Sequence, residues 1–211
     1  MSGFIFDLDG TLADTIPYVL VTARKAFRLM GVELTDEQLL AFPGVPLLKM
    51  GQDVFGEEEG PRFVEVYHKF YYEDRFVPPA FPGVPEMLDK LKKAGGHLSI
   101  CTSKLKGPAH DTVNAIGADH YIDVLIHCES GYGAKPSPEP VLAAVRLLGE
   151  KQETCCFIGD SVHDIMAAKA AGITAIGVTW GCATAEQLCG AGADIICDTV
   201  DQLTELLLKR I

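Results

Sequence analysis

Short apolar runs recur along the chain and are separated by longer segments with helical periodicity. The runs have little polar alternation, which is typical of strands that are covered on both faces. They lie at residues 3–6, 97–102, 122–127, 154–159, 173–178 and 194–197. Between them, apolar residues follow helical spacing near 85–91, 140–148 and 162–170. This alternation predicts βαβ units and an α/β fold with a doubly wound, mainly parallel sheet.

Residues 14 to about 80 interrupt this rhythm with a segment that is far longer than one crossover helix requires. The segment is expected to be helical throughout, with an aromatic stripe at residues 63–70 as its own core. Four prolines within residues 77–85 form a stiff connector back to the sheet. We therefore predict an α/β core domain at 1–13 and 83–211 and an inserted α-helical domain, here called the cap, at 14–82.

Polar residues follow the apolar runs at the points where the strands are expected to end. The groups are Asp7, Asp9 and Thr11; Thr102, Ser103 and Lys104; and Asp160 and Asp164. Lys135 lies in a proline-fixed loop before a helix. If the strands are neighbours in one parallel sheet, all of these groups face one crevice.

Such a cluster of carboxylates cannot stay fully ionised without a cation, and oxygen ligands without His or Cys favour Mg²⁺. Lys135, the Thr102 hydroxyl and loop N–H groups would bind phosphoryl oxygens, so the site fits a phosphate ester. Simpler interpretations remain open. Asp9 precedes Gly10 in a common turn pair, Ser161 and Asp164 fit a capping box, Thr102 and Ser103 could cap a helix after residue 108, and Lys135 could be a surface lysine.

The amino-acid composition limits the kinds of partner that the protein is expected to bind. A formal charge of −11 with no basic run argues against nucleic acid or an acidic membrane surface as a partner. No apolar stretch approaches the roughly 20 residues that span a bilayer, and no export signal is evident. The seven cysteines show no zinc-ligand spacing and are expected to be core thiols of a cytoplasmic protein.

These motifs, in this order, resemble those of the haloacid-dehalogenase-like hydrolases. The matching stretches are Asp7-Leu-Asp9-Gly10-Thr11-Leu, Thr102, Lys135, and Gly-Asp160 followed by Asp164. The position of the helical insert resembles the α-helical cap of the phosphoglycolate phosphatase and β-phosphoglucomutase group, so the resemblance spans essentially the whole chain. The stretches AKPSPEPVLAA and FIGDSVHDIMAAKAAG are similar to the phosphoglycolate phosphatase and pyrophosphatase branch.

The resemblance implies a Mg²⁺-dependent phosphatase that acts through an aspartyl-phosphate. Asp7 would be the nucleophile and Asp9 the general acid and base, while Thr102 and Lys135 hold the phosphoryl oxygens. Gly10, Thr11, Thr102, Ser103 and Lys135 would surround the substrate. Mg²⁺ would be held by Asp7, the backbone carbonyl of Asp9 and Asp160, with Asp164 supporting its water shell.

Departures from the family pattern bear on the substrate. Asp9 is the residue that the dehalogenase branch lacks. Val19 stands where sugar-phosphate mutases of this group usually carry His, residues 44–47 lack the Arg of their cap loop, and Ser103 replaces the Asn of phosphoglycolate phosphatases. A small phosphomonoester of the phosphoglycolate type is thus the predicted substrate, with pyrophosphatase and β-phosphoglucomutase-like mutase activity as alternatives.

Other classes of protein fit the chain less well. A receiver-type signalling domain is much shorter and has no reason to carry the insert, and a non-catalytic binding protein would be expected to have lost Asp7, Asp9 or Asp160. Candidate anion contacts in the cap are Arg24, Lys25, Arg28, Lys49 and Arg62. Hinges for cap movement are predicted near 13–16 and 78–83.

Overall fold

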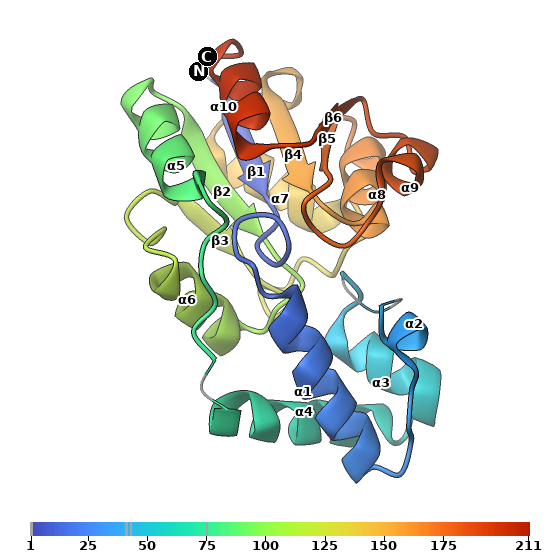
Figure 1. Ribbon diagram of the computed structural model, residues 1–211. Coiled ribbons are helices and arrows are strands. Elements are labelled where there is room, and N and C mark those ends of the chain that lie inside the picture. The colour runs from blue at the N-terminus through green and yellow to red at the C-terminus, as the bar shows by residue number, and fades with distance from the viewer. Residues whose placement is uncertain (1, 41, 43, 75) are drawn as a thin grey trace.

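A six-stranded, fully parallel sheet forms the centre of the molecule in the computed structural model, which describes residues 2–40, 42, 44–74 and 76–211 (Figure 1). The strands are β1 (Gly3–Phe6), β2 (His97–Cys101), β3 (Val124–Ile126), β4 (Cys155–Gly159), β5 (Thr174–Val178) and β6 (Ile195–Cys197). Their order is β3-β2-β1-β4-β5-β6. Each predicted apolar run contains one of these strands, so the expected α/β class is confirmed.

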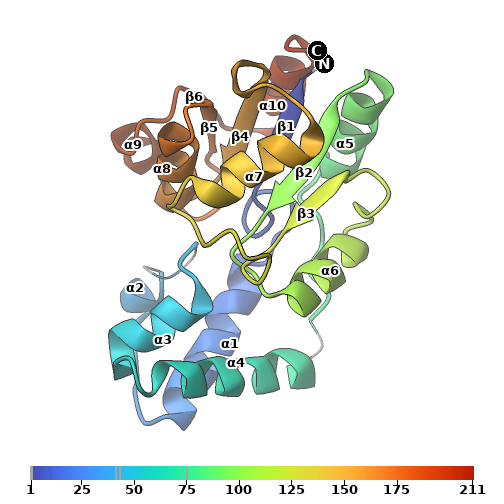
Figure 2. The same ribbon diagram turned by 180° about the vertical axis from the view of Figure 1, so that it is seen from behind.

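Helices cover both faces of the sheet (Figures 1 and 2). On one face lie α5 (Val84–Lys93), α6 (Lys106–Ala115) and α10 (Val200–Leu208), and on the other lie α7 (Glu139–Leu148), α8 (Val162–Ala170) and α9 (Ala185–Gly190). Phe4 and Phe6 of β1 pack into the first layer and Ile5 into the second. Because both faces are buried, the strands are mainly apolar, with His97, Ser99 and Thr174 as polar exceptions. Helices α9 and α10, and the short 3-10 helix η1 (Gln152–Thr154), were not predicted.

Within its described residues, the inserted segment contains four helices: α1 (Ile16–Leu29), α2 (Asp36–Leu39), α3 (Leu47–Phe55) and α4 (Gly60–Asp74). They enclose a hydrophobic cluster of their own around Phe27, Met50 and Phe63, separate from the two clusters on the sheet. The predicted aromatic stripe on α4 lies in or against this cluster. This separate core supports our proposal that residues 14–82 form a cap domain.

The two connections between cap and sheet run side by side. Ala13 forms an antiparallel bridge with Ala80, and the Asp14 N–H donates to the Pro79 carbonyl oxygen at 2.9 Å. The Phe81 N–H donates to the Leu12 carbonyl oxygen at 3.1 Å. The predicted hinge segments are therefore joined, and they hold the cap over the carboxyl ends of the strands (Figures 1 and 2).

The strand order places a crevice beside β1. The chain builds from β1 outward through β2 to β3 and then crosses back to β4, on the other side of β1. In open parallel sheets, ligands bind at the carboxyl ends of the strands where the winding direction reverses. Asp7 follows β1 and Asp160 follows β4, so both acids lie at this reversal.

The expectation that the cysteines are core thiols holds for only part of them, because Cys128 and Cys182 are half-buried and Cys189 is exposed. All seven cysteines are free thiols, and Cys101, Cys155, Cys156 and Cys197 are buried in strands. No helix in the described part of the chain combines the length and the apolar character that a membrane crossing requires.

Candidate active site

Three buried carboxylates meet at the carboxyl ends of β1 and β4. One oxygen from each of Asp7, Asp160 and Asp164 lies within 4.8 Å of the others. Asp7 is fixed by its backbone, because its N–H extends the strand pairing by donating to the Ile158 carbonyl oxygen at 2.8 Å. The expectation that these acids share one crevice is confirmed.

Lys135 enters this cluster from the loop between β3 and α7 and is 3% exposed. Its Nζ lies 2.8 Å from Asp7 Oδ1 and 2.6 Å from Asp164 Oδ1, and it donates to the Cys101 carbonyl oxygen at 3.1 Å. Burial opposes the charge of the ammonium, but the carboxylates of Asp164 and Asp7 outweigh it and raise the pKa of Lys135. Lys135 is thus a buried cation and not a surface lysine.

The three acids exceed the charge that one lysine can neutralise. Burial and the charge of Asp164 raise the pKa of Asp7 well above its ordinary value, even with Lys135 beside it. The same two causes raise the pKa of Asp160 to about 6. A buried cluster with this deficit of positive charge, and with oxygen donors only, fits a hard divalent cation such as Mg²⁺.

The carboxylate of Asp160 is held by groups from two other loops. Thr11 Oγ1 donates to Asp160 Oδ1 at 2.9 Å, and the Cys182 N–H donates to Oδ2 at 2.8 Å. Trp180 Nε1 in turn donates to the Thr11 carbonyl oxygen at 3.0 Å. The roles of Trp180 and Cys182 escaped the sequence interpretation, because the loop after β5 carries no recognisable motif.

Two glycines allow the backbone to approach Asp160 closely. A Cβ on Gly10 or on Gly181 would lie 2.2 Å from Asp160 Oδ2, and Gly10 also has a φ of +79°. Gly10 and Thr11 therefore lie against Asp160. Gly181 gave no sequence signal, since a single glycine in a loop is common.

Asp164 serves two neighbours at once. Its Oδ2 accepts from the Ser161 N–H at 3.0 Å, and the Asp164 N–H donates to Ser161 Oγ at 3.2 Å, which together form the capping box of α8. Ser161 Oγ also donates to Oδ2 at 2.6 Å. Its Oδ1 binds Lys135. The capping interpretation was therefore correct, and it does not compete with membership of the acidic cluster.

Thr102 and Ser103 do not cap the next helix. Helix α6 begins after Leu105, which is too far along the chain for either hydroxyl to cap it, and the first N–H of the helix, that of Lys106, donates instead to Glu129 Oε2 at 2.8 Å. Thr102 Oγ1 accepts from the Lys104 N–H at 3.2 Å, and the buried Ser103 Oγ has no partner among the described groups. The alternative interpretation of these residues as helix caps is wrong.

Asp9 turns away from the line of β1 and pairs with Lys104. The strand ends at Phe6, and the N–H groups of Leu12 and Ala13 both donate to the Leu8 carbonyl oxygen, so the chain folds back after Asp7. The Asp9 carboxylate forms an ion pair with Lys104 Nζ. Lys104 belongs to a strand end that the sequence singled out, but its partner could not be deduced from the sequence.

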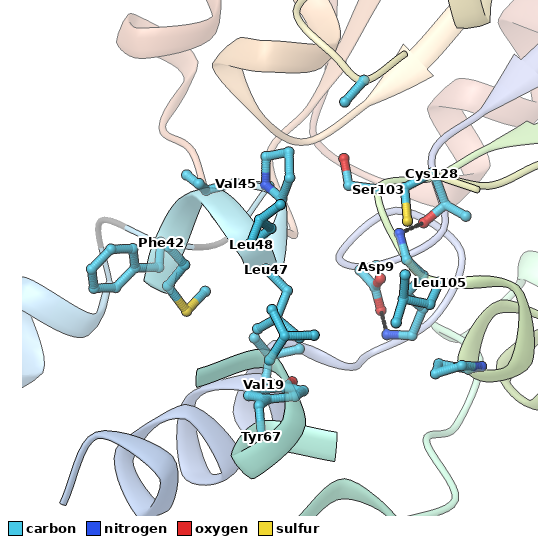
Figure 3. Close-up of a pocket in the computed structure, with 18 of the residues that line it drawn as sticks. Asp9, Val19, Phe42, Val45, Leu47, Leu48, Tyr67, Ser103, Leu105 and Cys128 are labelled. Atoms are coloured by element: carbon cyan, nitrogen blue, oxygen red, sulfur yellow. Dashed lines mark hydrogen bonds and ion pairs between the residues drawn. The ribbon is translucent and has the colours of Figure 1, made fainter. Parts of the chain in front are cut away.

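A cavity of about 350 Å³ opens between this strand edge and the cap (Figure 3). Asp7, Asp9, Thr102, Ser103 and Lys104 line its core side. Lys135, Gly10 and Thr11 are absent from the lining found among the described residues and lie behind these groups. The Asp7 carboxylate thus separates a charged interior from a cavity that a substrate can occupy.

The candidate anion contacts of the cap are engaged elsewhere. Each of the five forms an ion pair with a nearby carboxylate: Arg24 with Asp36, Lys25 with Asp74, Arg28 with Glu33, Lys49 with Asp53, and Arg62 with Glu59. None of them lines the cavity as far as the described residues define it.

Comparison with known proteins identifies the family. The model of the haloacid dehalogenase-like hydrolases matches residues 4–178. The chain belongs to this family. The probable phosphatase IndB of Dickeya dadantii is 35% identical over 207 residues, which cover 94% of this haloacid dehalogenase-like hydrolase and 90% of that protein.

Further relatives of this haloacid dehalogenase-like hydrolase carry two kinds of name. A phosphoglycolate phosphatase of Caulobacter vibrioides is 33% identical, with 90% of this chain and 84% of that protein covered. A pyrophosphatase PpaX of Oceanobacillus iheyensis is 27% identical, with 96% and 95% covered. The solved structure of a predicted phosphatase from Clostridium acetobutylicum aligns with a TM-score of 0.89 at 25% identity, covering 99% and 98% of the two chains. The protein is a phosphatase of the haloacid dehalogenase-like family.

Proposed function

We propose that the protein hydrolyses a small phosphomonoester in a Mg²⁺-dependent reaction through an aspartyl-phosphate on Asp7. The observation that carries the proposal is the placement of Asp7, between the buried cluster with Asp160, Asp164 and Lys135 and the cavity under the cap. The Asp7 carboxylate is thus held by the Lys135 ammonium and is also available to a ligand in the cavity.

The first step transfers the phosphoryl group to the protein. A carboxylate oxygen of Asp7 attacks phosphorus while the bond from phosphorus to the ester oxygen breaks, and the leaving alkoxide takes a proton from Asp9. In the second step Asp9 removes a proton from water, and the hydroxide displaces Asp7 from phosphorus. Inorganic phosphate and the alcohol leave, and both acids return to their starting states.

The remaining residues position and neutralise charge. Lys135 balances the charge of Asp7 and Asp164, and the hydroxyls of Thr102 and Ser103 bind phosphoryl oxygens. Asp7, the backbone carbonyl of Asp9 and Asp160 would hold Mg²⁺, with Asp164 supporting the ion's water shell. When bound, the ion neutralises charge that develops on the transferred phosphoryl group.

Hydrolysis is favoured over the mutase alternative by two cavity positions. Val19 and the segment 44–47 line the cavity, and neither offers the His or Arg that the mutase resemblance would require. The names of the relatives support 2-phosphoglycolate and pyrophosphate as candidate substrates. The unbridged thiols support a cytoplasmic location as part of the same proposal.

The experiment that tests the proposal is phosphate release measured with Mg²⁺ and with a chelator. The panel contains 2-phosphoglycolate, pyrophosphate, β-glucose-1-phosphate, several sugar phosphates and simple alkyl phosphates. We expect Mg²⁺-dependent release from at least one monoester. Release that survives the chelator unchanged, or no release from any compound by folded protein, contradicts the proposal.

A further inference from the structure

The two sides of the cavity differ in chemistry. On the core side lie Asp7, Asp9, Thr102, Ser103 and Lys104, the charged and hydroxyl groups proposed to surround the phosphoryl group, with Leu105, Pro108, Cys128 and Ala134 at their margin. The opposite side is built by the cap, and Figure 3 shows apolar side chains facing Asp9 and Ser103 across the cavity. Those labelled there are Val19, Val45, Leu47 and Leu48, together with Tyr67, whose ring also carries a hydroxyl. Phe42 is labelled as well, but its ring points away from Asp9 and stacks on Phe27. A substrate phosphorylated at one end would therefore place its other end among mainly hydrocarbon groups.

Charge on the cap side is absent from the described lining residues. His68 is the one titratable base that the cap contributes to the lining found there, and burial lowers its pKa, so it is neutral at neutral pH. On the core side, Lys104 is paired with Asp9. A carboxylate or a second phosphate in this space would lose its hydration without gaining an unpaired cation, which is strongly unfavourable.

The size of the cavity agrees with this chemistry. A volume of about 350 Å³ lies within the range of sites that enclose small organic ligands. Such a space exceeds the needs of a phosphoryl group with a two-carbon acid. Filling it with apolar atoms gains free energy in proportion to the area removed from water.

We infer that the substrate is a phosphomonoester whose alcohol part is uncharged and largely apolar, such as an alkyl or arylmethyl alcohol. The inference rests on the proposed phosphatase chemistry and assigns the substrate class to the same site. Leu47 is the position that discriminates best, because it is half-buried at the start of α3 and faces the cavity opposite Asp9 (Figure 3).

The test compares ethyl, n-butyl, n-hexyl and benzyl phosphate with 2-phosphoglycolate and pyrophosphate. The alkyl esters release similar alkoxides, so differences among them report binding of the alcohol part. We expect kcat/KM to rise about fourfold for each added methylene until the cavity is filled. n-Hexyl and benzyl phosphate are expected to exceed 2-phosphoglycolate and pyrophosphate by at least about tenfold.

A charge-introducing variant sharpens the test. Leu47→Arg is expected to reduce the preference for n-hexyl phosphate over 2-phosphoglycolate by at least about tenfold. Leu40→Arg is the matched control, because Leu40 also lies in the cap, is 58% exposed and is not part of the lining. The control is expected to keep the wild-type preference.

The result that overturns the inference is Mg²⁺-dependent turnover that favours 2-phosphoglycolate or pyrophosphate over every alkyl and benzyl ester. That result leaves the proposed phosphatase function intact. If no compound is turned over, the proposed function fails, and the substrate-class inference is then tested by the binding of non-hydrolysable phosphonates. Tighter calorimetric binding of n-hexylphosphonate than of phosphonoacetate then supports it, and equal or weaker binding refutes it.

Discussion

The core side and the cap side of the active-site cavity are built on different principles. The core side collects charged groups from strand ends that lie far apart in the sequence, and it buries three carboxylates around one lysine. The cap side is an extension of a small hydrophobic core, with Tyr67 belonging to both the cap cluster and the cavity lining. The core side holds charged groups at fixed positions, and the cap side keeps water away from them.

This difference indicates how the work is divided. Phosphoryl transfer requires catalytic groups that are held at fixed positions. Side chains at the ends of the parallel strands meet this requirement, because helices pack against both faces of the sheet and hold the strands in place. Selection of the alcohol requires only shape and polarity, which four helices with their own core can supply. The predictions below separate these contributions, beginning with the largest effect.

Asp7→Asn removes the proposed nucleophile from the core side of the cavity. An amide cannot form the acyl phosphate, so kcat for phosphate release is expected to fall at least about 10⁴-fold while the cap side is unchanged. Stopped assays of phosphate release measure the loss. Asp119→Asn, at an exposed position outside the site, is the matched control and should keep wild-type activity. Substantial Mg²⁺-dependent turnover in Asp7→Asn contradicts the assigned roles.

Lys135→Met removes the buried cation and leaves its carboxylates unpaired. We expect about 3 kcal/mol lower free energy of unfolding without Mg²⁺, and about 10²-fold lower kcat, since neither Asp7 nor Asp164 has another cation within ion-pair distance among the described residues. Urea titration measures the stability. Lys93→Met, which removes an exposed ion pair with Asp89, should leave the free energy of unfolding essentially unchanged. Equal effects of both variants would refute a special role for Lys135.

Mg²⁺ and pH should act together on stability. Burial and the charge of Asp164 raise the pKa of Asp160 to about 6, above its ordinary 3.8, so the folded protein binds a proton that the unfolded chain has lost. Without Mg²⁺, this carboxyl lowers stability as pH rises from about 4 to about 6. The cation binds the ionised form, so the increase in Tm caused by Mg²⁺ should be larger at pH 7.5 than at pH 5. Thermal unfolding at both pH values measures this, and an increase that is equal or larger at pH 5 contradicts it.

Gly44→Ala tests the contact between the two sides and should have the smallest effect. A Cβ on Gly44 would lie 2.8 Å from Ser161 Cβ, so the cap loop must move away from the core, and we expect KM to rise about fivefold. Gly56→Ala is the control, because Gly56 has a similar φ of +86° but nothing within 4 Å of its Cβ. Both variants carry the same backbone strain of about 1 kcal/mol. If KM changes equally in the two, the contact does not position the cap.

The sequence predicted the core side better than the cap side, for a physical reason. Asp7 and Asp160 directly follow β1 and β4, and strand ends converge in any parallel sheet, so the meeting of these two acids follows from topology. Lys135 reaches them from the loop between β3 and α7, at the same edge of the sheet. Partners such as Lys104 for Asp9, or Cys182 for Asp160, depend on loop conformations that no periodicity specifies. In the cap, Val19 and Leu47 look like ordinary core residues, and only their position in the fold places them in the cavity.

The phosphorylation of Asp7 is the central claim, and the Asp9→Asn variant tests it most directly. p-Nitrophenyl phosphate has a leaving group that needs no proton, so this variant should phosphorylate itself but fail to activate water. Rapid quenching, borohydride reduction and peptide mass analysis then locate the acyl phosphate. We predict a burst of one p-nitrophenolate per protein and modification at Asp7 alone. No burst, or modification at another residue, would contradict the mechanism.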